Sequence, residues 1–101
     1  MGDVNDTPQV VDDPAASRFM VEADGRVAEL VYQLEGDRLL LIHTGVPRAL
    51  EGQGFGGKLV AAAMDEAKRR GLTVVPLCPF ARDWLVRHPD VAATVPVDGL
   101  G

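Results

Sequence analysis

The chain has 101 residues, of which 47% are hydrophobic and 25% are charged, so it has the size and composition of one small globular domain. It contains no uninterrupted apolar run of the ~20 residues that a membrane helix needs, and its first ten residues lack the basic and apolar regions of a signal peptide. The formal net charge of −5 argues against nucleic-acid binding through bulk positive charge. We therefore expect a cytoplasmic protein with no nucleic-acid partner and no membrane partner.

Both ends of the chain are expected to lie outside the folded domain. Residues 1–16 are polar and acidic and include two prolines, a composition that buries too little apolar surface to become ordered. We interpret them as a disordered acidic N-terminal tail, residues 17–93 as the domain, and residues 94–101 as a loosely held C-terminal tail. The single cysteine, Cys78, fits a reducing compartment and excludes a cysteine-rich zinc site, so no metal is expected.

Three β-strands are expected at the start of the domain. Residues 18–23 and 27–34 have strand patterns and are joined by Asp24-Gly25, a strong hairpin turn signal. A second turn at 35–37 leads to a strand over 38–46. Its apolar residues 39–42 do not alternate with polar ones, as expected of a central strand covered on both faces. Consecutive hairpins predict an antiparallel meander.

A strand–helix–strand unit follows the meander. Residues 56–71 carry apolar side chains at helical spacing and end in three basic residues and Gly71, a plausible C-terminal cap. Residues 73–78 are expected to form a strand parallel to that at 38–46, because such crossovers are right-handed and return in the same direction. Pro79 then opens a short helix in which Phe80, Trp84 and His88 recur at a spacing of four.

The stretch EGQGFGG, residues 51–57, precedes the first helix and fits more than one phosphate-binding pattern. Gly52, Gly54 and Gly57 match the dinucleotide fingerprint, and residues 52–58 match the start of a P-loop. The first pattern needs an acid about 20 residues later, where this chain has the apolar residues 75–78. The second needs Ser or Thr after the lysine, where this chain has Leu59. Neither nucleotide pattern is therefore complete.

A third pattern relies on the same physics for another ligand. A glycine-rich turn that leads into a helix presents backbone N–H groups and the positive end of the helix dipole, which bind a diphosphate without a metal. In acetyltransferases of the GNAT superfamily, the pattern Gln/Arg-x-x-Gly-x-Gly/Ala binds the diphosphate of coenzyme A. Here Glu51, Gly54 and Gly56 occupy these positions, so the glycines match and the first position is acidic.

Residues 42–90 resemble the small GNAT-like N-acetyltransferase family. They carry its three segments in register: HTGVP at 43–47, the glycine loop at 51–57, and PLCPF at 76–80 ahead of His-Pro at 88–89. The resemblance implies a minimal GNAT fold of the α/β (α+β) class. In this fold an antiparallel meander is followed by a strand–helix–strand unit with splayed parallel strands and a short C-terminal helix. Pro76 fits a splayed strand, because proline cannot donate to a strand ladder.

The resemblance also implies acetyl-CoA as co-substrate and the amine of a small molecule or a protein as acceptor. Arg48 and Lys58, which flank the glycines, are candidates for the cofactor's phosphates. The residues expected to contact the cofactor are Thr44, Val46, Arg48, Gly52, Gln53, Gly54, Phe55, Gly56, Gly57, Lys58, Cys78 and Phe80.

Cys78 and His43 are the candidate catalytic residues. Cys78 precedes a helix start, where the dipole favours the thiolate. Many GNAT enzymes place a tyrosine acid near this point, yet the only tyrosine here, Tyr32, lies on an early strand. Cys78 is thus a candidate for the acid that protonates departing coenzyme A, for an acetyl-accepting nucleophile, or for a small buried hydrophobe. His43 is either the base that accepts the amine proton or a structural strand residue.

The sequence therefore predicts an N-acetyltransferase that moves an acetyl group from acetyl-CoA to an amine, by a ternary complex or through acetyl-Cys78. Glu51 and the missing tyrosine support an alternative, a non-catalytic acyl-CoA-binding or protein-interaction module on the same fold. An acid beside a diphosphate repels it unless its side chain turns away or pairs with Arg48.

Overall fold

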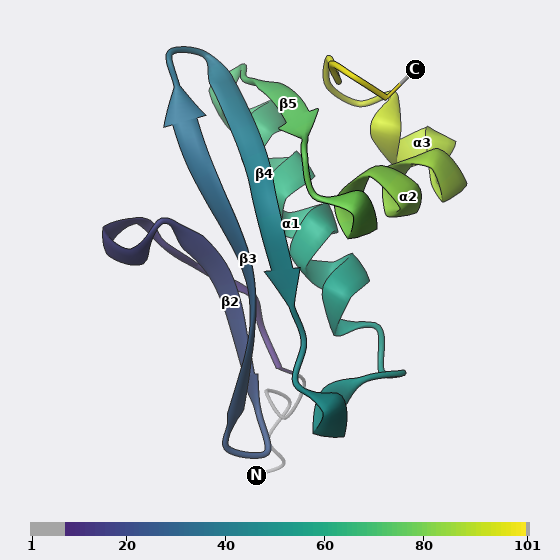
Figure 1. Ribbon diagram of the computed structural model, residues 1–101. Coiled ribbons are helices and arrows are strands. Elements are labelled where there is room, and N and C mark those ends of the chain that lie inside the picture. The colour runs from purple at the N-terminus through teal and green to yellow at the C-terminus, as the bar shows by residue number, and fades with distance from the viewer. Residues whose placement is uncertain (1–7, 101) are drawn as a thin grey trace, which may run out of the picture.

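The computed structural model of the chain describes residues 8–100 and comprises one sheet with helices on one side (Figure 1). The elements in chain order are β1 (Val11–Asp13), η2 (Pro14–Ala16), β2 (Arg18–Ala23), β3 (Arg26–Glu35), β4 (Arg38–Gly45), η3 (Arg48–Leu50), α1 (Phe55–Arg70), β5 (Thr73–Pro76), α2 (Pro79–Arg87) and α3 (Pro89–Ala92).

The sheet order is β1-β2-β3-β4-β5, with β1 to β4 antiparallel and β5 parallel to β4. The antiparallel meander, the strand–helix–strand unit and the short helix at Pro79 are therefore confirmed. The order follows from the hairpin turns and from the return of the chain through α1, which packs on β2, β3, β4 and β5.

The core lies between the sheet and α1. Alternate strand residues face the helix and are buried, among them Phe19 and Val21 of β2 and Leu39 and Leu41 of β4. Within residues 8–100, the opposite face of the sheet carries no α-helix, which differs from the expectation that β4 is covered on both sides (Figure 1). Ile42 is 38% exposed for this reason.

The predicted strand at 73–78 is shorter than expected. It ends at Pro76 because the N–H of Leu77 turns back to donate to Val75 O at 3.0 Å. Its last partner in β4 is Leu41, while β4 continues to Gly45 against β3 alone. The two parallel strands thus separate after Leu41, and the Cys78 N–H donates to Leu41 O at 2.9 Å at the point of separation.

The expected N-terminal tail is partly ordered. Residues 1–7 lie outside the described residues, but Val11–Asp13 form β1 on the edge of the sheet. The composition of this segment does not reveal two side-chain contacts that hold it, one long-range and one local. The Tyr32 hydroxyl donates to Asp12 at 2.7 Å, and Arg18 lies 3.7 Å from Asp13.

The expected C-terminal tail is also held in place, apart from Gly101, which lies outside the described residues. Val74 of β5 donates its N–H to Pro96 O at 2.9 Å and accepts from the Asp98 N–H at 2.8 Å. The Asp98 carboxylate forms an ion pair with Arg38 at 2.9 Å. Backbone pairing to the free edge of β5 therefore replaces the loose end that the composition suggested.

Candidate functional site

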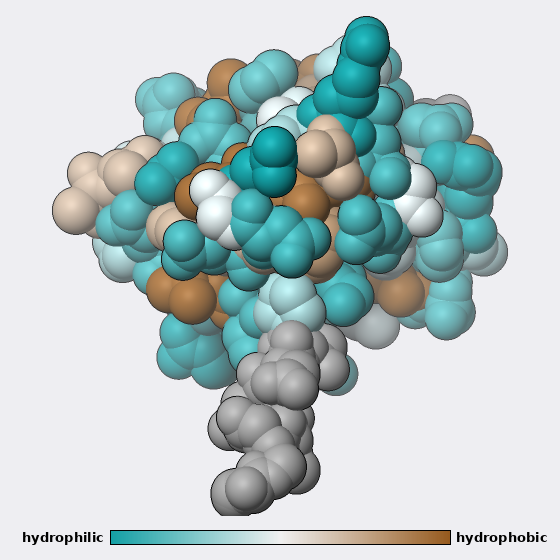
Figure 2. All heavy atoms as spheres, turned by 90° about the horizontal axis from the view of Figure 1, so that it is seen from below, coloured by the Kyte–Doolittle hydropathy of each residue, from teal (hydrophilic) through white to brown (hydrophobic). Residues whose placement is uncertain are grey.

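A cavity of about 710 Å³ lies beyond the end of β4, between the glycine loop and the start of α2. Viewed from this end of the molecule, hydrophobic areas alternate with hydrophilic residues (Figure 2). The lining residues are Thr44, Val46, Leu50, Glu51, Gly52, Gly54, Phe55, Gly56, Gly57, Lys58, Ala61, Phe80 and Trp84. The structure thus brings together nine of the residues expected to contact a cofactor, and it adds Leu50, Glu51, Ala61 and Trp84.

The glycine loop forms the polar wall of this cavity. Gly52 and Gly54 have φ values of 82° and 81°, in the left-handed region that favours glycine. Gly54 is the N-cap of α1 and has no side chain that could accept a hydrogen bond from the helix. The N–H groups of the first turn of a helix have no intrahelical acceptor, and in α1 they belong to Phe55, Gly56 and Gly57. They remain available to an anion.

Two glycines of the loop are explained by helix packing. A Cβ on Gly56 would lie 2.6 Å from the Phe80 ring, and a Cβ on Gly57 would lie 2.5 Å from Trp84 Nε1. The absence of side chains lets α2 approach the first turn of α1, so that both aromatic rings line the cavity. The His88 ring stacks on Trp84 at a centroid distance of 3.9 Å, and its Nδ1 lies 2.7 Å from Trp84 O. This stacking holds the Trp84 ring in its position in the cavity wall.

An irregularity in the sheet decides which side chains of β4 face the cavity. The register of β3 and β4 shifts between Val31 and Tyr32, so that Val31 pairs with His43 while Tyr32 pairs with Leu41. Thr44 therefore lies on the helix side and lines the cavity. His43 points to the open face of the sheet and is exposed. The structure thus separates the two predicted catalytic residues, His43 and Cys78, onto opposite faces.

Cys78 lies just behind the cavity wall and is only 4% exposed. Its sulfur is 3.2 Å from the Thr44 hydroxyl oxygen. Burial on its own would raise the pKa of the thiol, but the Thr44 hydroxyl and the backbone N–H groups of Ala81 and Phe80 stabilise the thiolate. The net result is a pKa below the ordinary value of a cysteine. The predicted helix-start environment of this sulfur is therefore present.

The charges around the cavity are few. Glu51 and Lys58 line it, and among residues 8–100 no cation forms an ion pair with Glu51. Lys58 Nζ lies 5.5 Å from the centroid of the Phe55 ring. Two residues expected at the cofactor lie elsewhere: Arg48 is exposed on η3, and Gln53 donates from Nε2 to Ala49 O at 3.4 Å. Neither lines the cavity.

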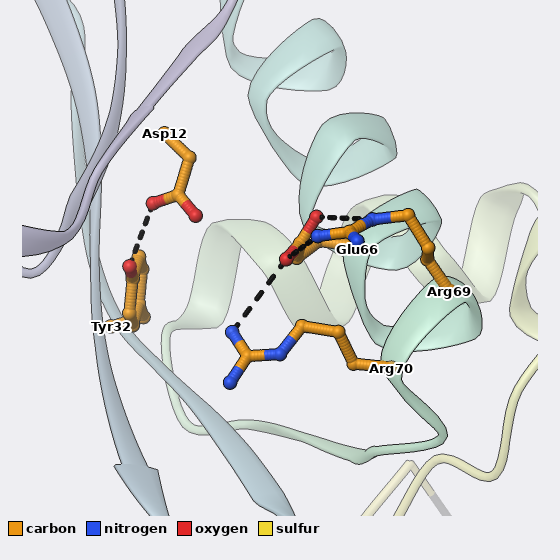
Figure 3. Close-up of polar contacts among 5 residues, drawn as sticks. All are labelled: Asp12, Tyr32, Glu66, Arg69 and Arg70. Atoms are coloured by element: carbon orange, nitrogen blue, oxygen red, sulfur yellow. Dashed lines mark hydrogen bonds and ion pairs between the residues drawn. The ribbon is translucent and has the colours of Figure 1, made fainter.

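The single tyrosine is occupied elsewhere in the molecule. The Tyr32 hydroxyl points to Asp12, near the ion pairs of Glu66 with Arg69 and Arg70 (Figure 3). Burial, followed by the hydrogen bond to Asp12, raises the pKa of Tyr32 to about 12. Tyr32 is absent from the cavity lining, whereas the Cys78 thiol lies 3.2 Å from the Thr44 hydroxyl oxygen.

Some signals of the added lining residues were present in the sequence. Trp84 stands one helical turn after Phe80, and Ala61 stands one turn after Gly57, so each follows a predicted site residue on the same helix face. Leu50 gave no signal, because its position depends on η3.

Residues 8–100 contain no group of three or more His, Cys, Asp or Glu side chains arranged to hold a metal ion. None of the helices in these residues is long and apolar enough to cross a membrane.

A comparison with protein families agrees with this site. A family model described as GCN5-related N-acetyl-transferase matches residues 18–95, from the first residue of β2 to the buried Val95. The match includes the separated strands, the glycine loop and the Cys78 region, and it covers more than half of the chain. The chain belongs to the family of GCN5-related N-acetyltransferases.

Proposed function

We propose that this protein transfers the acetyl group of acetyl-CoA to a primary amine. The observation that supports this most strongly is the composition of one cavity. It combines three features. The first N–H groups of α1 have no intrahelical acceptor. The end of β4 has no parallel partner in β5, and the Thr44 hydroxyl contacts the Cys78 thiol, whose pKa is lowered. These are the features needed to bind a diphosphate, to orient a thioester and to protonate a leaving thiolate.

The diphosphate of coenzyme A is assigned to the first turn of α1. The N–H groups of Phe55, Gly56 and Gly57 supply donors there, and Lys58 supplies a positive charge at the same wall. Glu51 opposes this charge, so that binding depends chiefly on the backbone. The cavity therefore fits coenzyme A with a weaker electrostatic contribution than an arginine at residue 51 would give.

The acetyl end is assigned to the region of Thr44 and Val46, where β4 has no β5 partner. Backbone groups on the free side of a strand polarise a carbonyl by hydrogen bonding. Phe80, which is 40% exposed, and Trp84 supply apolar surface for the pantetheine arm. The chain's main contribution is positioning.

We assign Cys78 the role of acid. Its sulfur is buried and lies behind Thr44, which makes direct attack on a substrate in the cavity difficult. Proton transfer is compatible with this arrangement: Thr44 Oγ1 donates its proton to the leaving sulfur and takes one from Cys78 Sγ. The pKa of the Cys78 thiol lies below the ordinary cysteine value, so this thiol is a stronger acid than an ordinary cysteine. The acetyl-Cys78 route requires movement of the Thr44 side chain and is the less favoured path.

Steady-state kinetics with acetyl-CoA and an amine panel, following release of free coenzyme A, test this function. The wild-type chain is expected to release coenzyme A only when an amine is present, and mass spectrometry is expected to find acetyl on the amine. Binding of acetyl-CoA without turnover for any amine would support the second candidate, a non-catalytic acyl-CoA-binding module. The observation that favours that candidate is Glu51, which lines the cavity and has no ion-pair partner among residues 8–100.

A further inference from the structure

The open face of the sheet carries a cluster of side chains that the cofactor cavity does not use. The shift in register turns His43 onto this face, where it lies beside Val31 of β3. Gly45 lies opposite Glu29 in the same strand pair. A Cβ on Gly45 would be 3.4 Å from His43 Nε2 and 3.9 Å from Glu29 Oε2. The imidazole and the carboxylate thus both lie within 4 Å of the position that a Gly45 side chain would occupy.

The charge of this cluster is negative. Glu29 accepts a hydrogen bond from Arg18 at 2.9 Å through Oε1, while its Oε2 is the oxygen beside Gly45. Arg18 also lies 3.7 Å from Asp13. One cation therefore faces two carboxylates, which leaves a net charge of −1 on these three residues. Such a site attracts an ammonium group and repels an anion.

The β4 residues of this cluster, His43 and Gly45, follow the point at which β4 and β5 separate, while Glu29 lies on the β3 side of β4. The last β4–β5 partners are Leu41 and Pro76, and the residues that follow them, Ile42 and Leu77, are 38% and 50% exposed. These two side chains supply apolar surface beside the gap for an alkyl chain. Thr44, next to His43 in the strand, faces the cavity on the other side of the sheet. An amine over Gly45 and a thioester beside Thr44 would therefore meet across the end of β4.

We infer that His43 and Glu29 form the acceptor site and that the acceptor is a primary alkylammonium carried by a cationic molecule. This inference rests on the proposed function. Glu29 holds the ammonium group as its counter-charge, and His43 Nε2 accepts one of its protons. The amine nitrogen then forms a bond to the thioester carbonyl carbon as the carbon–sulfur bond breaks. The second proton passes from the nitrogen to solvent water. The leaving sulfur takes a proton from Thr44, which takes one from Cys78, and the Cys78 thiolate is then reprotonated from solvent, so the products are an acetamide and a free thiol.

The experiment uses the full chain with two probe amines, spermidine and a short peptide with one lysine. Amide chemical shifts are followed by nuclear magnetic resonance as each amine is added to the protein, with and without coenzyme A. Acetylation rates are measured on the same samples with acetyl-CoA. The variants are Glu29→Gln, His43→Gln and the control Glu35→Gln, which makes the same charge change at the exposed far end of β3, six residues or ~20 Å from Glu29.

At least one amine is expected to shift the amides of His43 and Gly45. Glu29→Gln is expected to weaken that binding and to raise the KM for the amine about tenfold while the KM for acetyl-CoA stays unchanged. His43→Gln is expected to lower kcat, and Glu35→Gln is expected to match wild type. Whichever probe responds identifies the source of the ammonium group, a polyamine or a protein side chain.

Two failures are distinguishable. If the protein binds acetyl-CoA but neither amine moves the amides of His43 and Gly45, or if Glu29→Gln behaves like Glu35→Gln, the inferred acceptor site is wrong and the proposed cofactor site stands. If wild-type protein does not bind acetyl-CoA, the proposed function and the inference both fail.

Discussion

The hydroxyl oxygen of Thr44 and the sulfur of Cys78 lie 3.2 Å apart at the point where β4 and β5 separate. One group lines the cavity and the other is buried behind it. The contact joins the end of a strand to the start of a helix, and it gives the single thiol of the chain a side-chain partner in addition to the backbone N–H groups of Phe80 and Ala81. The proposed acid catalysis rests on this contact, through which Cys78 supplies a proton to Thr44.

Replacement of this thiol is expected to slow turnover without loss of cofactor binding. Cys78→Ser retains a small polar group but loses the acidity of the thiol, so kcat is expected to fall about 10- to 100-fold. This loss is at the low end of the effects of general acids, because a thiolate is a good leaving group even without protonation. Thr44→Val is expected to give a similar loss, since it breaks the relay. Steady-state kinetics of both variants test this expected loss of kcat, and the dissociation constant for acetyl-CoA is the control. A normal kcat for Cys78→Ser would show that Cys78 takes no part in the reaction.

The pH dependence follows from the direction of the Cys78 pKa. The acid must be protonated, so kcat is expected to fall as pH rises through the pKa of this thiol, which lies below the ordinary cysteine value. Because the chain has one cysteine, thiolate absorbance at 240 nm reports that pKa directly. The two midpoints are expected to coincide in wild type, whereas a thiol that titrates well above the alkaline limb of kcat would rule out this assignment.

The packing of α2 on α1 predicts a glycine requirement that is independent of any ligand. Gly57→Ala adds a methyl group 2.5 Å from Trp84 Nε1, and the stack with His88 holds that ring in place. Overpacking costs about 1–3 kcal/mol, more than the ~1 kcal/mol that alanine gains over glycine in a helix. A net loss of stability is expected in urea unfolding.

The loss of stability in Gly57→Ala is compared with that in Gly56→Ala, a substitution at the neighbouring glycine. Its neighbour Phe80 is 40% exposed and has room to move, so the cost is expected to be smaller. The double variant Gly57→Ala/Trp84→Ala relieves the clash, and a Gly57→Ala cost that persists unchanged in the Trp84→Ala background would contradict the packing explanation.

Replacement of Glu51, the acidic residue that lines the cavity, is expected to increase the affinity for coenzyme A. Glu51→Gln removes a negative charge from the wall assigned to the diphosphate, and at about 4 Å in water one charge contact is worth ~1 kcal/mol. The dissociation constant for coenzyme A is expected to fall about fivefold at low salt and less at high salt. Glu22→Gln, an exposed acid on β2, is the control and is expected to have no effect. Equal affinities of wild type and Glu51→Gln at low salt would place the diphosphate elsewhere.

The hydrogen bond from Tyr32 to Asp12 predicts how firmly β1 is attached. Tyr32→Phe is expected to cost about 1–2 kcal/mol of unfolding free energy, because it removes a bond to a carboxylate. The folded-state pKa of about 12 lies above the ordinary tyrosine value of ~10. The stabilisation is therefore fully present below pH ~10 and is lost as pH rises through the folded-state value.

Absorbance at 295 nm measures this pKa without ambiguity, since Tyr32 is the only tyrosine. Denaturation of wild type and Tyr32→Phe at neutral pH and near pH 11 then tests the linkage. An alkaline loss of stability that is equal in both proteins would show that Tyr32 does not cause it.

The sequence predicted those parts of the fold that depend on local pattern. The hairpin at Asp24-Gly25, the helix after the glycines and the helix at Pro79 each carry their own turn, cap or periodicity signal. The cavity wall at residues 52–58 was predictable for the same reason, because loop and helix start are contiguous in the chain.

The parts that were not predictable depend on contacts between distant residues. β1 is ordered by partners such as Tyr32, twenty positions away, which composition does not reveal. The bulge opposite Val31 has no glycine or proline to mark it, yet it moves His43 to the face opposite Thr44. An uninterrupted alternation would have placed His43 on the cavity side with Leu41. The acceptor site inferred here is a consequence of that single shift in register.

A calorimetric titration of the purified chain with acetyl-CoA, with ATP and NAD as controls, tests the central claim most directly. We predict saturable binding of acetyl-CoA alone, with a dissociation constant below about 1 mM, which corresponds to ~4 kcal/mol of binding free energy. Absence of binding at near-millimolar acetyl-CoA, or equal binding of ATP, would contradict the assignment of this cavity to coenzyme A.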